Sequence, residues 1–532
     1  MLTPRVQLFL LGVAALLPLL GIAVLLWRRF YREDSDNTAR RVFKNSAVPT
    51  AVRLIIRAID MAFALVLYRL LDAGPIGQYD LAALLVVQYL GTFADFGLGT
   101  LLTREVARRP AEAERFFGTT LIMRWGFALL AFPAAFALIG MYGGIAVLVP
   151  GAQSLSADGA AAILILCLTL IPSAYNNVVT AVFNARERLE IPAAVELVTQ
   201  IISVFLRVGV LLADWGVVGL AWAAVATTSL TAFVMLFLQL RLLFAPTLAW
   251  NSAFARSLLR PAFPLLLNSL LINVAFSFDA FILRAFSSDV AVAQYRMPYR
   301  IINVALILPP IVTSAIFPII SRYAEDNRAA LNRAYRLTLQ VLLLAAFPIA
   351  VGSTVLSRDL VQFFTGRDVG QFLPVSSQAL SILIWFLPLS YLNGLTQYVL
   401  IALGRQSSIT RGFAVMAAFN FVGNLLLIPW FGLFAACVLT ILSEVVLYAM
   451  FLQLLRRENC VPPIGAVAWR PAVAALLMGA AMLLVRPMLV YPFGAITAAV
   501  IAPFVYGVAL TLLGTFGAEE RALARRVLGR GA

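Results

Sequence analysis

The sequence predicts an all-α polytopic membrane protein with about 14 core transmembrane helices and an additional N-terminal anchor helix. Its 532 residues are 62% hydrophobic and 12% charged, whereas a soluble domain carries about 25% charged residues. Apolar runs of the roughly 20 residues that a membrane-spanning helix needs recur from end to end. A third observation, an internal repeat, divides the first twelve spans into two parallel-repeat six-helix bundles around a central cavity.

The formal net charge of +15 follows a topological pattern. Basic residues cluster in alternate loops. The loops between these clusters contain none, namely 72–78, 140–159, 213–217, 285–292 and 487–492, and only 357–374 breaks the alternation. This is the positive-inside pattern, which predicts a cytoplasmic C-terminus and makes a nucleic-acid partner unnecessary as an explanation of the charge.

Signatures of enzymes and metal sites are missing from the sequence. The three cysteines, Cys167, Cys437 and Cys460, are scattered, and histidine is absent, which removes the commonest metal ligand and proton shuttle. No phosphate-binding GxxxxGK[ST] loop occurs. We therefore expect a protein that is not an enzyme and that holds neither a metal nor a cofactor.

The N-terminal segment, 1–46, is expected to be an anchor and a linker. Residues 6–27 are apolar, and no small-residue cleavage site follows Trp27-Arg28-Arg29, so an uncleaved anchor fits better than a signal peptide. Residues 28–46 carry charges of both signs and predict a cytoplasmic linker.

Fourteen further stretches are long and apolar enough to predict spans. They lie at about 47–71, 79–101, 116–139, 160–184, 191–212, 218–241, 261–284, 293–321, 335–356, 375–403, 409–429, 432–455, 468–486 and 493–515. They predict an N-terminal bundle at 47–241, a C-terminal bundle at 261–456, two additional helices at 468–515 and a cytoplasmic tail at 516–532. No loop has room for an extramembrane catalytic domain.

The internal repeat rests on three motifs that recur at nearly one offset. They are Pro172-x-x-Tyr175-x-Asn177-x-x-Thr180 with Pro388-x-x-Tyr391-x-Asn393-x-x-Thr396, Gln78-Tyr79 with Gln294-Tyr295, and Phe-Leu-Gln-Leu at 237–240 with 451–454. Six predicted spans lie within the offset, and an even number preserves orientation. The two halves are therefore expected to be related by an axis along the membrane normal, with substrate between them.

The first span carries three charged residues on one helix face. Arg53, Arg57 and Asp60 are spaced at i, i+4 and i+7. Arg53 could snorkel to the cytoplasmic interface, and Arg57 and Asp60 could form an internal ion pair. The functional alternative is a cationic patch in a cavity that opens to the cytoplasm.

The stretch 268–303 predicts a charged hairpin of two membrane helices. Asn268 and Asp279 share one side of its first helix. One side of its second helix carries four polar residues, Arg296, Tyr299, Arg300 and Asn303. Near the predicted outer interface, Arg284 and Arg296 are expected to snorkel, whereas Arg300 lies deeper.

Arginines facing lipid would be costly. For Arg53, Arg57, Arg296 and Arg300 together the cost would be on the order of 10 kcal/mol, comparable to the net stability of a domain. We expect them to face a hydrated cavity or to pair with Asp60 and Asp279. Because arginine suits bidentate phosphate recognition, these four are candidate ligands for an anion such as a phosphate or diphosphate. A cationic drug would call for the opposite charge.

Single charges also occur in other spans. Arg124, Arg207, Glu196 and Glu444 have no partner by spacing, and structural pairing is the favoured interpretation. Intramembrane carboxylates are also ion-coupling candidates, so Asp60, Asp279, Glu196 and Glu444 are assigned to ion coupling or charge pairing.

The repeated proline motif is expected to shape a kink, because proline removes a helix bond that asparagine and threonine can replace. The alternative places Tyr175, Asn177, Tyr391 and Asn393 in a polar cavity lining, together with Asn268, Tyr299 and Asn303. The run Asp95-Phe96-Gly97-Leu98-Gly99 is expected to end or bend the second span, with Asp95 at the cytoplasmic face.

Several motifs in order resemble bacterial polysaccharide flippases of the multidrug/oligosaccharidyl-lipid/polysaccharide (MOP) exporter superfamily. The resemblance covers about 47–456. It is carried by the segments 69–79, 94–99, 104–107, 278–279, 294–300, 317–322, 403–406 and 424–429 and by Gly432.

The resemblance implies two six-helix bundles around a V-shaped cavity in the bacterial cytoplasmic (inner) membrane. It also implies export of an undecaprenyl-diphosphate-linked oligosaccharide by alternating access, in several members driven by an ion gradient. The implied partners are the lipid-linked glycan substrate, membrane lipid, and polysaccharide polymerases or glycosyltransferases. Alternatives are a lipid II-type flippase, a multidrug exporter of the same superfamily, a glycan polymerase or ligase, and a non-transporting scaffold on that fold.

Overall fold

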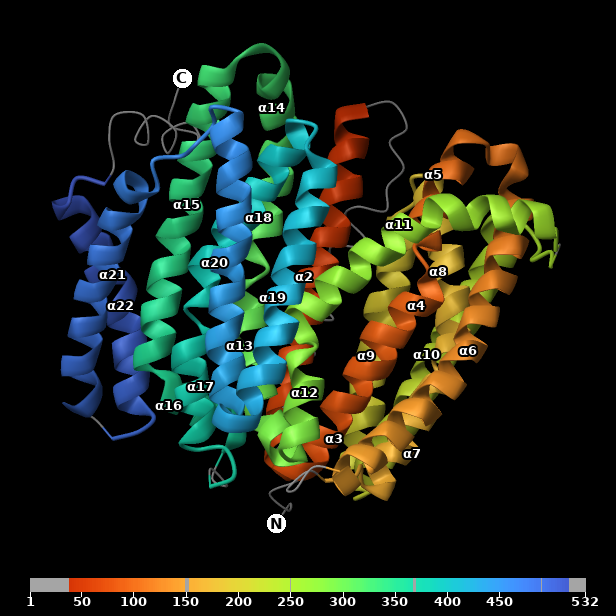
Figure 1. The fold of residues 1–532 in the computed structure, drawn as a ribbon, viewed down its shortest axis with the longest axis horizontal. Helices are drawn as coiled ribbons and strands as arrows, with labels where there is room; N and C mark the ends of the chain where they lie inside the picture. Colours follow the sequence, from red (N-terminus) through yellow and green to blue (C-terminus); the bar gives the residue numbers. More distant parts are fainter. Residues whose placement is uncertain (1–37, 149–152, 249, 367–369, 489, 516–532) are drawn as a thin grey trace. The chain divides into compact units, whose positions relative to one another are not determined.

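The computed structural model describes residues 38–148, 153–248, 250–366, 370–488 and 490–515. The predicted anchor at 6–27 and the predicted tail at 516–532 lie outside these residues. Every regular element in the described part is helical, and Figure 1 shows their order along the chain. The predicted all-α class is therefore confirmed.

The chain falls into two compact units. Among the described residues, the first unit comprises those up to Arg296 together with those within Phe364–Gln371 and Ile428–Gly432, and the second unit comprises the rest. The predicted bundle boundaries at 47–241 and 261–456 remain a prediction.

In its described residues, the first unit contains eleven α-helices and the start of a twelfth, α13. They are α2 (Thr38–Leu70), α3 (Ala73–Ala83), the π-helical η1 (Leu84–Leu90), α4 (Gly91–Asp95), α5 (Leu98–Arg108), the short η2 (Pro110–Glu112), α6 (Ala113–Leu148), α7 (Ala157–Leu168), α8 (Leu170–Ala185), α9 (Glu190–Leu212), α10 (Gly216–Leu242), α11 (Ser252–Ser277), α12 (Asp279–Phe286) and the beginning of α13 (Asp289–Ala305).

The second unit contains the end of α13 and the helices that follow it. They are α14 (Leu308–Asp326), α15 (Arg328–Val355), α16 (Ser357–Thr365), α17 (Val375–Leu383), α18 (Phe386–Ala402), α19 (Gln406–Phe431), α20 (Leu433–Arg457), α21 (Ile464–Val485), the short η3 (Arg486–Met488) and α22 (Phe493–Leu512). A few residues of α16 and α19 belong to the first unit.

Thirteen helical stretches of the described part are long and apolar enough to cross a membrane. Some of them, such as Ala73–Arg108 and Ala157–Ala185, consist of consecutive labelled helices. The thirteen stretches correspond to thirteen of the fourteen predicted spans. The remaining predicted span, 47–71, lies in α2, whose 33 residues are long enough to cross a bilayer at about 1.5 Å per residue. Its charges, including Arg53, Arg57 and Asp60, lower its hydropathy. The chain is a multi-pass membrane protein.

Side chains that precede three of the helices cap their N-termini. Ser156 accepts a hydrogen bond from the Gly159 amide at the start of α7. Asn251 and Asn327 accept equivalent bonds at the starts of α11 and α15. Each cap satisfies an amide that the first helical turn leaves without a partner.

The predicted break in the second span is present. Helix α4 ends at Asp95, and Phe96 and Gly97 have left-handed backbone angles, with φ of 50° and 72°. A Cβ on Gly97 would lie 2.6 Å from the Leu265 side chain of α11. Glycine is therefore required here both by conformation and by close packing.

The proline motif also breaks its helices, as expected. Helix α7 ends at Leu168 and α8 begins at Leu170, so the first break, at Thr169, precedes Pro172 by one turn. In the second unit α17 ends at Leu383 and α18 begins at Phe386, one turn before Pro388. Proline cannot supply the missing helix bond.

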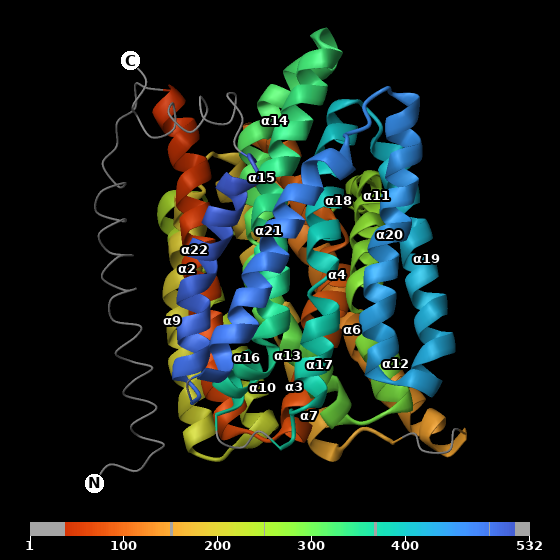
Figure 2. The same ribbon diagram turned by 90° about the vertical axis from the view of Figure 1, so that its left-hand side faces the viewer.

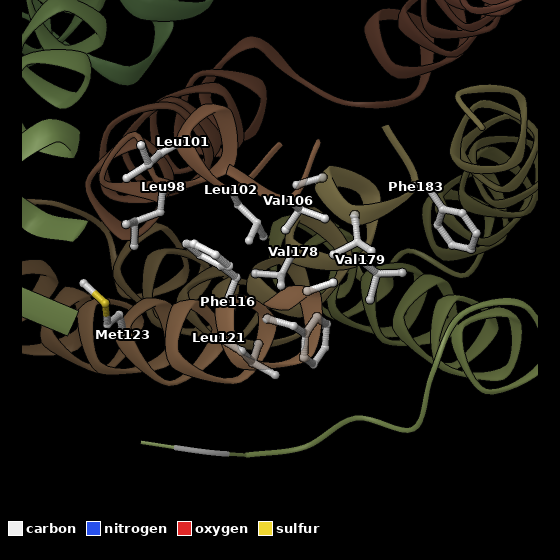
Figure 3. Close-up of a cluster of buried hydrophobic side chains, with 14 of the residues drawn as sticks. Leu98, Leu101, Leu102, Val106, Phe116, Leu121, Met123, Val178, Val179 and Phe183 are labelled. Carbon is white, nitrogen blue, oxygen red and sulfur yellow. The ribbon is translucent and has the colours of Figure 1, made fainter. Parts of the chain in front are cut away.

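An apolar cluster joins α5, α6 and α8 in the first unit. Figure 3 shows Leu102, Phe116 and Val178 gathered between these helices, and all three are at most 2% exposed. Burying a side chain of this size contributes about 1.5–3 kcal/mol. This cluster holds the helices that carry one wall of the site described below.

The two last helices pack together against α15, as Figures 1 and 2 show within the second unit. Met478 and Met482 of α21 and Tyr506 of α22 are buried in their cluster. The Tyr506 hydroxyl donates to the Leu344 carbonyl at 2.9 Å, and Arg486 pairs with Asp359 at 2.7 Å. The pair is thus fixed to α15 by apolar contacts and the Tyr506 hydrogen bond, and the residues that follow α21 are fixed to α16 by the Arg486–Asp359 ion pair.

The π-helical segment η1 is fastened to α11 by side-chain amides. Gln88 donates to Asn273 at 3.1 Å and to Ser277 at 3.2 Å. Asn273 in turn donates to the Gln88 carbonyl at 3.2 Å, and the Tyr89 hydroxyl donates to the Asn273 carbonyl at 2.8 Å. Irregular helical turns of this kind are common at functional sites.

Arg284 does not snorkel, so that expectation is wrong. Its side chain is 1% exposed and pairs with Asp289. It also donates to the carbonyls of Gln153 and Ser154 at 3.0 and 2.9 Å. Its position near a helix end could not reveal these hydrogen bonds, because the carbonyl partners lie 131 and 130 residues earlier in the chain.

The same corner explains Gly77 and Gln78, two residues of the segment 69–79. The Gln78 amide donates to the Asp289 carboxylate at 3.1 Å. A Cβ on Gly77 would lie 1.9 Å from the Asp289 carbonyl oxygen. The absence of a side chain at Gly77 therefore lets α3 reach the start of α13.

We expect Gly77→Ala to destabilise the protein by about 3 kcal/mol, the upper end of the usual cost of overpacking. The upper end applies because the Asp289 carbonyl is a backbone group and cannot rotate away from the new methyl group. The measurement is the thermal unfolding midpoint in detergent. Gly74→Ala is the matched control on α3, because a Cβ there meets nothing within 4 Å. An unchanged midpoint for Gly77→Ala would contradict the close approach.

Candidate functional site

The charged face of α2 lines a cavity inside the first unit. Arg53, Arg57 and Asp60 all border it, as their spacing on one helix face predicts. Arg53 and Arg57 are exposed, whereas Asp60 is half-buried. The three residues therefore meet a common space.

The opposing wall comes from α9. Glu196, Gln200, Ser203 and Arg207 border the same cavity. These four are spaced at i, i+4, i+7 and i+11, which is one helix face. The interpretation of Glu196 and Arg207 as isolated charges missed this pattern, because Gln200 and Ser203 between them are uncharged.

We call this cavity, of about 590 Å³, the cationic chamber. It is lined by Arg53, Arg57, Asp60, Glu196, Gln200 and Arg207, with Tyr79, Thr227 and Thr228. Its three arginines outnumber its two carboxylates. Its volume lies within the roughly 300–1,000 Å³ of small-molecule sites.

Contacts in the cationic chamber hold one carboxylate and one arginine in place. Gln200 donates to Asp60 at 2.5 Å. The Arg207 guanidinium lies over the Phe63 ring, 4.3 Å from its centroid, and donates to the Ser203 carbonyl at 3.3 Å. A cation over an aromatic face is oriented by the ring's charge distribution.

The other two arginines are less restrained. Arg53 interacts electrostatically with Glu196. Arg53 and Arg57 make no hydrogen bond or ion pair to another residue whose side chain is described. Their guanidinium donors are therefore free to bind an anion that enters the chamber.

A second cavity, of about 510 Å³, adjoins the first. We call it the polar chamber. Its polar lining consists of Thr92, Asp95, Arg124, Thr169, Ser173, Asn176, Asn177, Thr228 and Ser269, with Tyr79. Both linings include Tyr79, Val87, Ala224 and Thr228, which form the shared wall.

A buried ion pair stands in the wall of the polar chamber. Arg124 is 1% exposed, and it pairs with Asp95, which is 35% exposed. Arg124 also donates to the Ala174 carbonyl at 3.5 Å. The favoured interpretation of Arg124 as a structural partner fits this geometry, and Asp95 is tied to Arg124.

Asp279 lies outside the linings of both chambers. It is 2% exposed and accepts bonds from the Tyr295 hydroxyl at 2.5 Å and the Ala280 amide at 2.7 Å. Arg296, half-buried, acts on it electrostatically. These contacts support charge pairing for Asp279.

Of the proline-motif residues, only Asn177 borders one of the two chambers. Tyr175 donates to Gln239 at 2.7 Å, which links two of the repeated motifs. Tyr391 donates to the Ala305 carbonyl at 2.5 Å, and Asn393 donates to Glu444 at 2.6 Å. Glu444 is 1% exposed, so these partners support a structural role for it.

The remaining predicted residues lie on α11 and α13. Asn268, Tyr299 and Arg300 are half-buried, and Asn303 is exposed. Arg300 belongs to the second unit and Arg296 to the first. Their assignment to the substrate site remains a prediction. Across the described residues, no group of three or more acidic or cysteine side chains is placed to hold a metal ion.

Comparison with known sequences gives two matches. Residues 66–373 match the sequence model of the family described as polysaccharide biosynthesis protein. The probable flippase AglR of Haloferax volcanii is 26% identical over 196 residues, which are 36% of this chain and 40% of that protein. The chain therefore spans less than half the length of this curated relative.

Comparison with solved structures identifies the fold. The lipid II flippase MurJ in an inward closed conformation superposes with a TM-score of 0.71 at 14% identity, over 88% of this chain and 99% of that one. An inward-facing multidrug transporter of the MATE family gives a TM-score of 0.56 at 18% identity, over 79% and 98%. The chain therefore shares the fold of these two transporters.

Proposed function

The chain belongs to the polysaccharide biosynthesis protein family, and from this premise we propose that it is a flippase. Its substrate is an undecaprenyl-diphosphate-linked oligosaccharide, which it carries across the bacterial cytoplasmic membrane by alternating access for cell-surface polysaccharide synthesis. It is a transporter and not an enzyme.

The observation that carries this proposal is the cationic chamber. Arg53, Arg57 and Arg207 meet in one space within a membrane-spanning unit, where charged side chains are otherwise costly. A diphosphate is a compact, doubly charged group that arginines bind in bidentate fashion. The prenyl tail has no need of a polar site and stays in the bilayer.

The positive-inside pattern supports the orientation of the proposal. The basic loops face the cytoplasm, where lipid-linked glycans are assembled, and the C-terminus lies on the same side. Glycosyltransferases would supply the substrate on that side, and a polysaccharide polymerase would use it on the other.

A lipid II-type flippase is the second candidate, favoured by the similarity of fold to MurJ. Lipid II carries the same diphosphate group, so the cationic chamber suits both substrates. A multidrug exporter of cationic compounds is disfavoured by the excess of arginines.

The direct test is reconstitution in proteoliposomes with three fluorescent probes: an undecaprenyl-diphosphate trisaccharide, lipid II and a cationic dye. We expect translocation of the trisaccharide lipid, measured as the fraction protected from a membrane-impermeant quencher. Preference for lipid II would favour the second candidate. Transport of the dye alone would favour the exporter, and no transport of any probe would favour a scaffold.

A further inference from the structure

The two chambers of the first unit differ in chemistry although they share a wall. The cationic chamber holds three arginines and two carboxylates. The polar chamber holds a single arginine, which its ion pair with Asp95 neutralises. Its other polar residues are uncharged amides and hydroxyls.

Uncharged amides and hydroxyls suit a ligand rich in hydroxyl groups. Each sugar hydroxyl both donates and accepts a hydrogen bond, and so do the side chains of Asn, Ser and Thr. The ring of Tyr79, in the shared wall, offers an apolar surface to a sugar ring. A diphosphate gains little in this chamber, because its one cation is already paired.

Helix α8 contributes the residues that remain available to a ligand. Asn177 is exposed in the polar chamber and forms no hydrogen bond within the described chain. Asn176 donates to the Thr228 carbonyl at 3.3 Å, but its side-chain oxygen is buried without a partner. Ser173 lies one turn before Asn177 on the same face and also borders the chamber.

A buried group aimed at the same space supports a built site. The Arg124 side chain is 99% buried and borders the polar chamber. Its Nε–H has no hydrogen-bond partner in the described chain. A buried donor without a partner is costly. A hydroxyl group of a bound ligand, or a water that it replaces, would satisfy it.

We propose that the polar chamber is the sugar subsite of the substrate: it binds the glycan next to the diphosphate, while the cationic chamber binds the diphosphate itself. The shared wall of Tyr79, Val87, Ala224 and Thr228 lets one ligand enter both chambers. Asn177 and Ser173 are then specificity-determining residues. This inference rests on the proposed function, because it assumes a diphosphate-linked glycan.

The test compares two probes on purified full-length protein in nanodiscs. One is farnesyl diphosphate, and the other is a set of farnesyl-diphosphate-linked hexoses and N-acetylhexosamines. Dissociation constants are measured for the wild type, Asn177→Ala, Ser173→Ala and Arg57→Gln. We expect the wild type to bind at least one glycosylated probe more tightly than farnesyl diphosphate.

The variants separate the two chambers. Losing one hydrogen bond should weaken binding of the glycosylated probe by about 3- to 10-fold in Asn177→Ala and Ser173→Ala, without changing the affinity for farnesyl diphosphate. Arg57→Gln should weaken both probes equally. Asn184→Ala, near the end of the same helix and outside both linings, is the matched control and should change neither.

The outcomes distinguish this inference from the proposed function. If the wild type binds neither probe, the proposed function fails. If it binds both probes with equal affinity, or if Asn177→Ala and Ser173→Ala weaken both probes alike or neither, the sugar subsite is wrong while the proposed function stands.

Discussion

Replacing both Arg53 and Arg57 by Gln is expected to weaken the binding of farnesyl diphosphate by roughly a hundredfold or more. A hydrogen bond to a charged group contributes about 1.5–3 kcal/mol, and both guanidinium groups are available in the cationic chamber. Glutamine keeps part of the length and polarity, so the loss reports charge. The measurement is the dissociation constant by isothermal titration calorimetry.

The matched control is the double variant Arg104→Gln/Arg108→Gln. It removes the same charge from exposed positions at the end of α5, where both arginines lie beside Glu105, and it should leave the affinity within about twofold because exposed charges are screened. An Arg53→Gln/Arg57→Gln protein that is monodisperse and binds normally would remove the cationic chamber from the mechanism.

Arg300 extends the same test to transport. Its depth in the second helix of the 268–303 hairpin makes it a candidate substrate ligand, and it belongs to the second unit. If Arg57→Ala and Arg300→Ala both leave translocation unchanged in protein that inserts normally, a cationic substrate path is wrong.

The spans were predictable because hydropathy and length are local properties of the chain. The breaks at Phe96-Gly97 and before Pro172 were predictable for the same reason, since glycine and proline act on their own backbone. Helix α16 (Ser357–Thr365) was not expected within the predicted loop 357–374. It is too short to give an apolar run of membrane length.

The site was predictable only where one helix carried the pattern. Arg53, Arg57 and Asp60 form a charged stripe, which helical spacing places on one face. Arg207 has no charged partner at helical spacing, so the sequence favours structural pairing for it. The residues that share its helix face, Gln200 and Ser203, are uncharged and give no sign of a charged stripe. In a membrane protein both lipid and core are apolar, so hydrophobic periodicity does not reveal which face is buried.

Side-chain pairs between different helices could not be predicted from the sequence for a different reason. Asp95 and Arg124 lie on α4 and α6, and no spacing rule connects them. Tyr175 with Gln239, and Asn393 with Glu444, are likewise tertiary contacts. Such partners emerge only when packing brings the helices together.

The Asp95–Arg124 pair should be a major determinant of stability, because the Arg124 side chain is only 1% exposed. We expect Arg124→Met to destabilise the protein by about 3 kcal/mol. Breaking a buried pair typically costs about 3–5 kcal/mol, because the remaining charge is uncompensated. The lower end applies, because Asp95 is 35% exposed and its carboxylate can be hydrated from the polar chamber. The measurement is the shift in unfolding midpoint in detergent.

Comparison with a double variant separates the loss of the pair from the loss of packing. In Asp95→Asn/Arg124→Met no charge remains, so the double variant should be more stable than Arg124→Met alone. Arg104→Met is the control: Arg104 is 52% exposed and pairs with Glu105, and an exposed pair contributes at most about 1 kcal/mol. Equal losses in Arg124→Met and the double variant would mean that Arg124 acts by its volume, and the ion pair would then contribute nothing to stability.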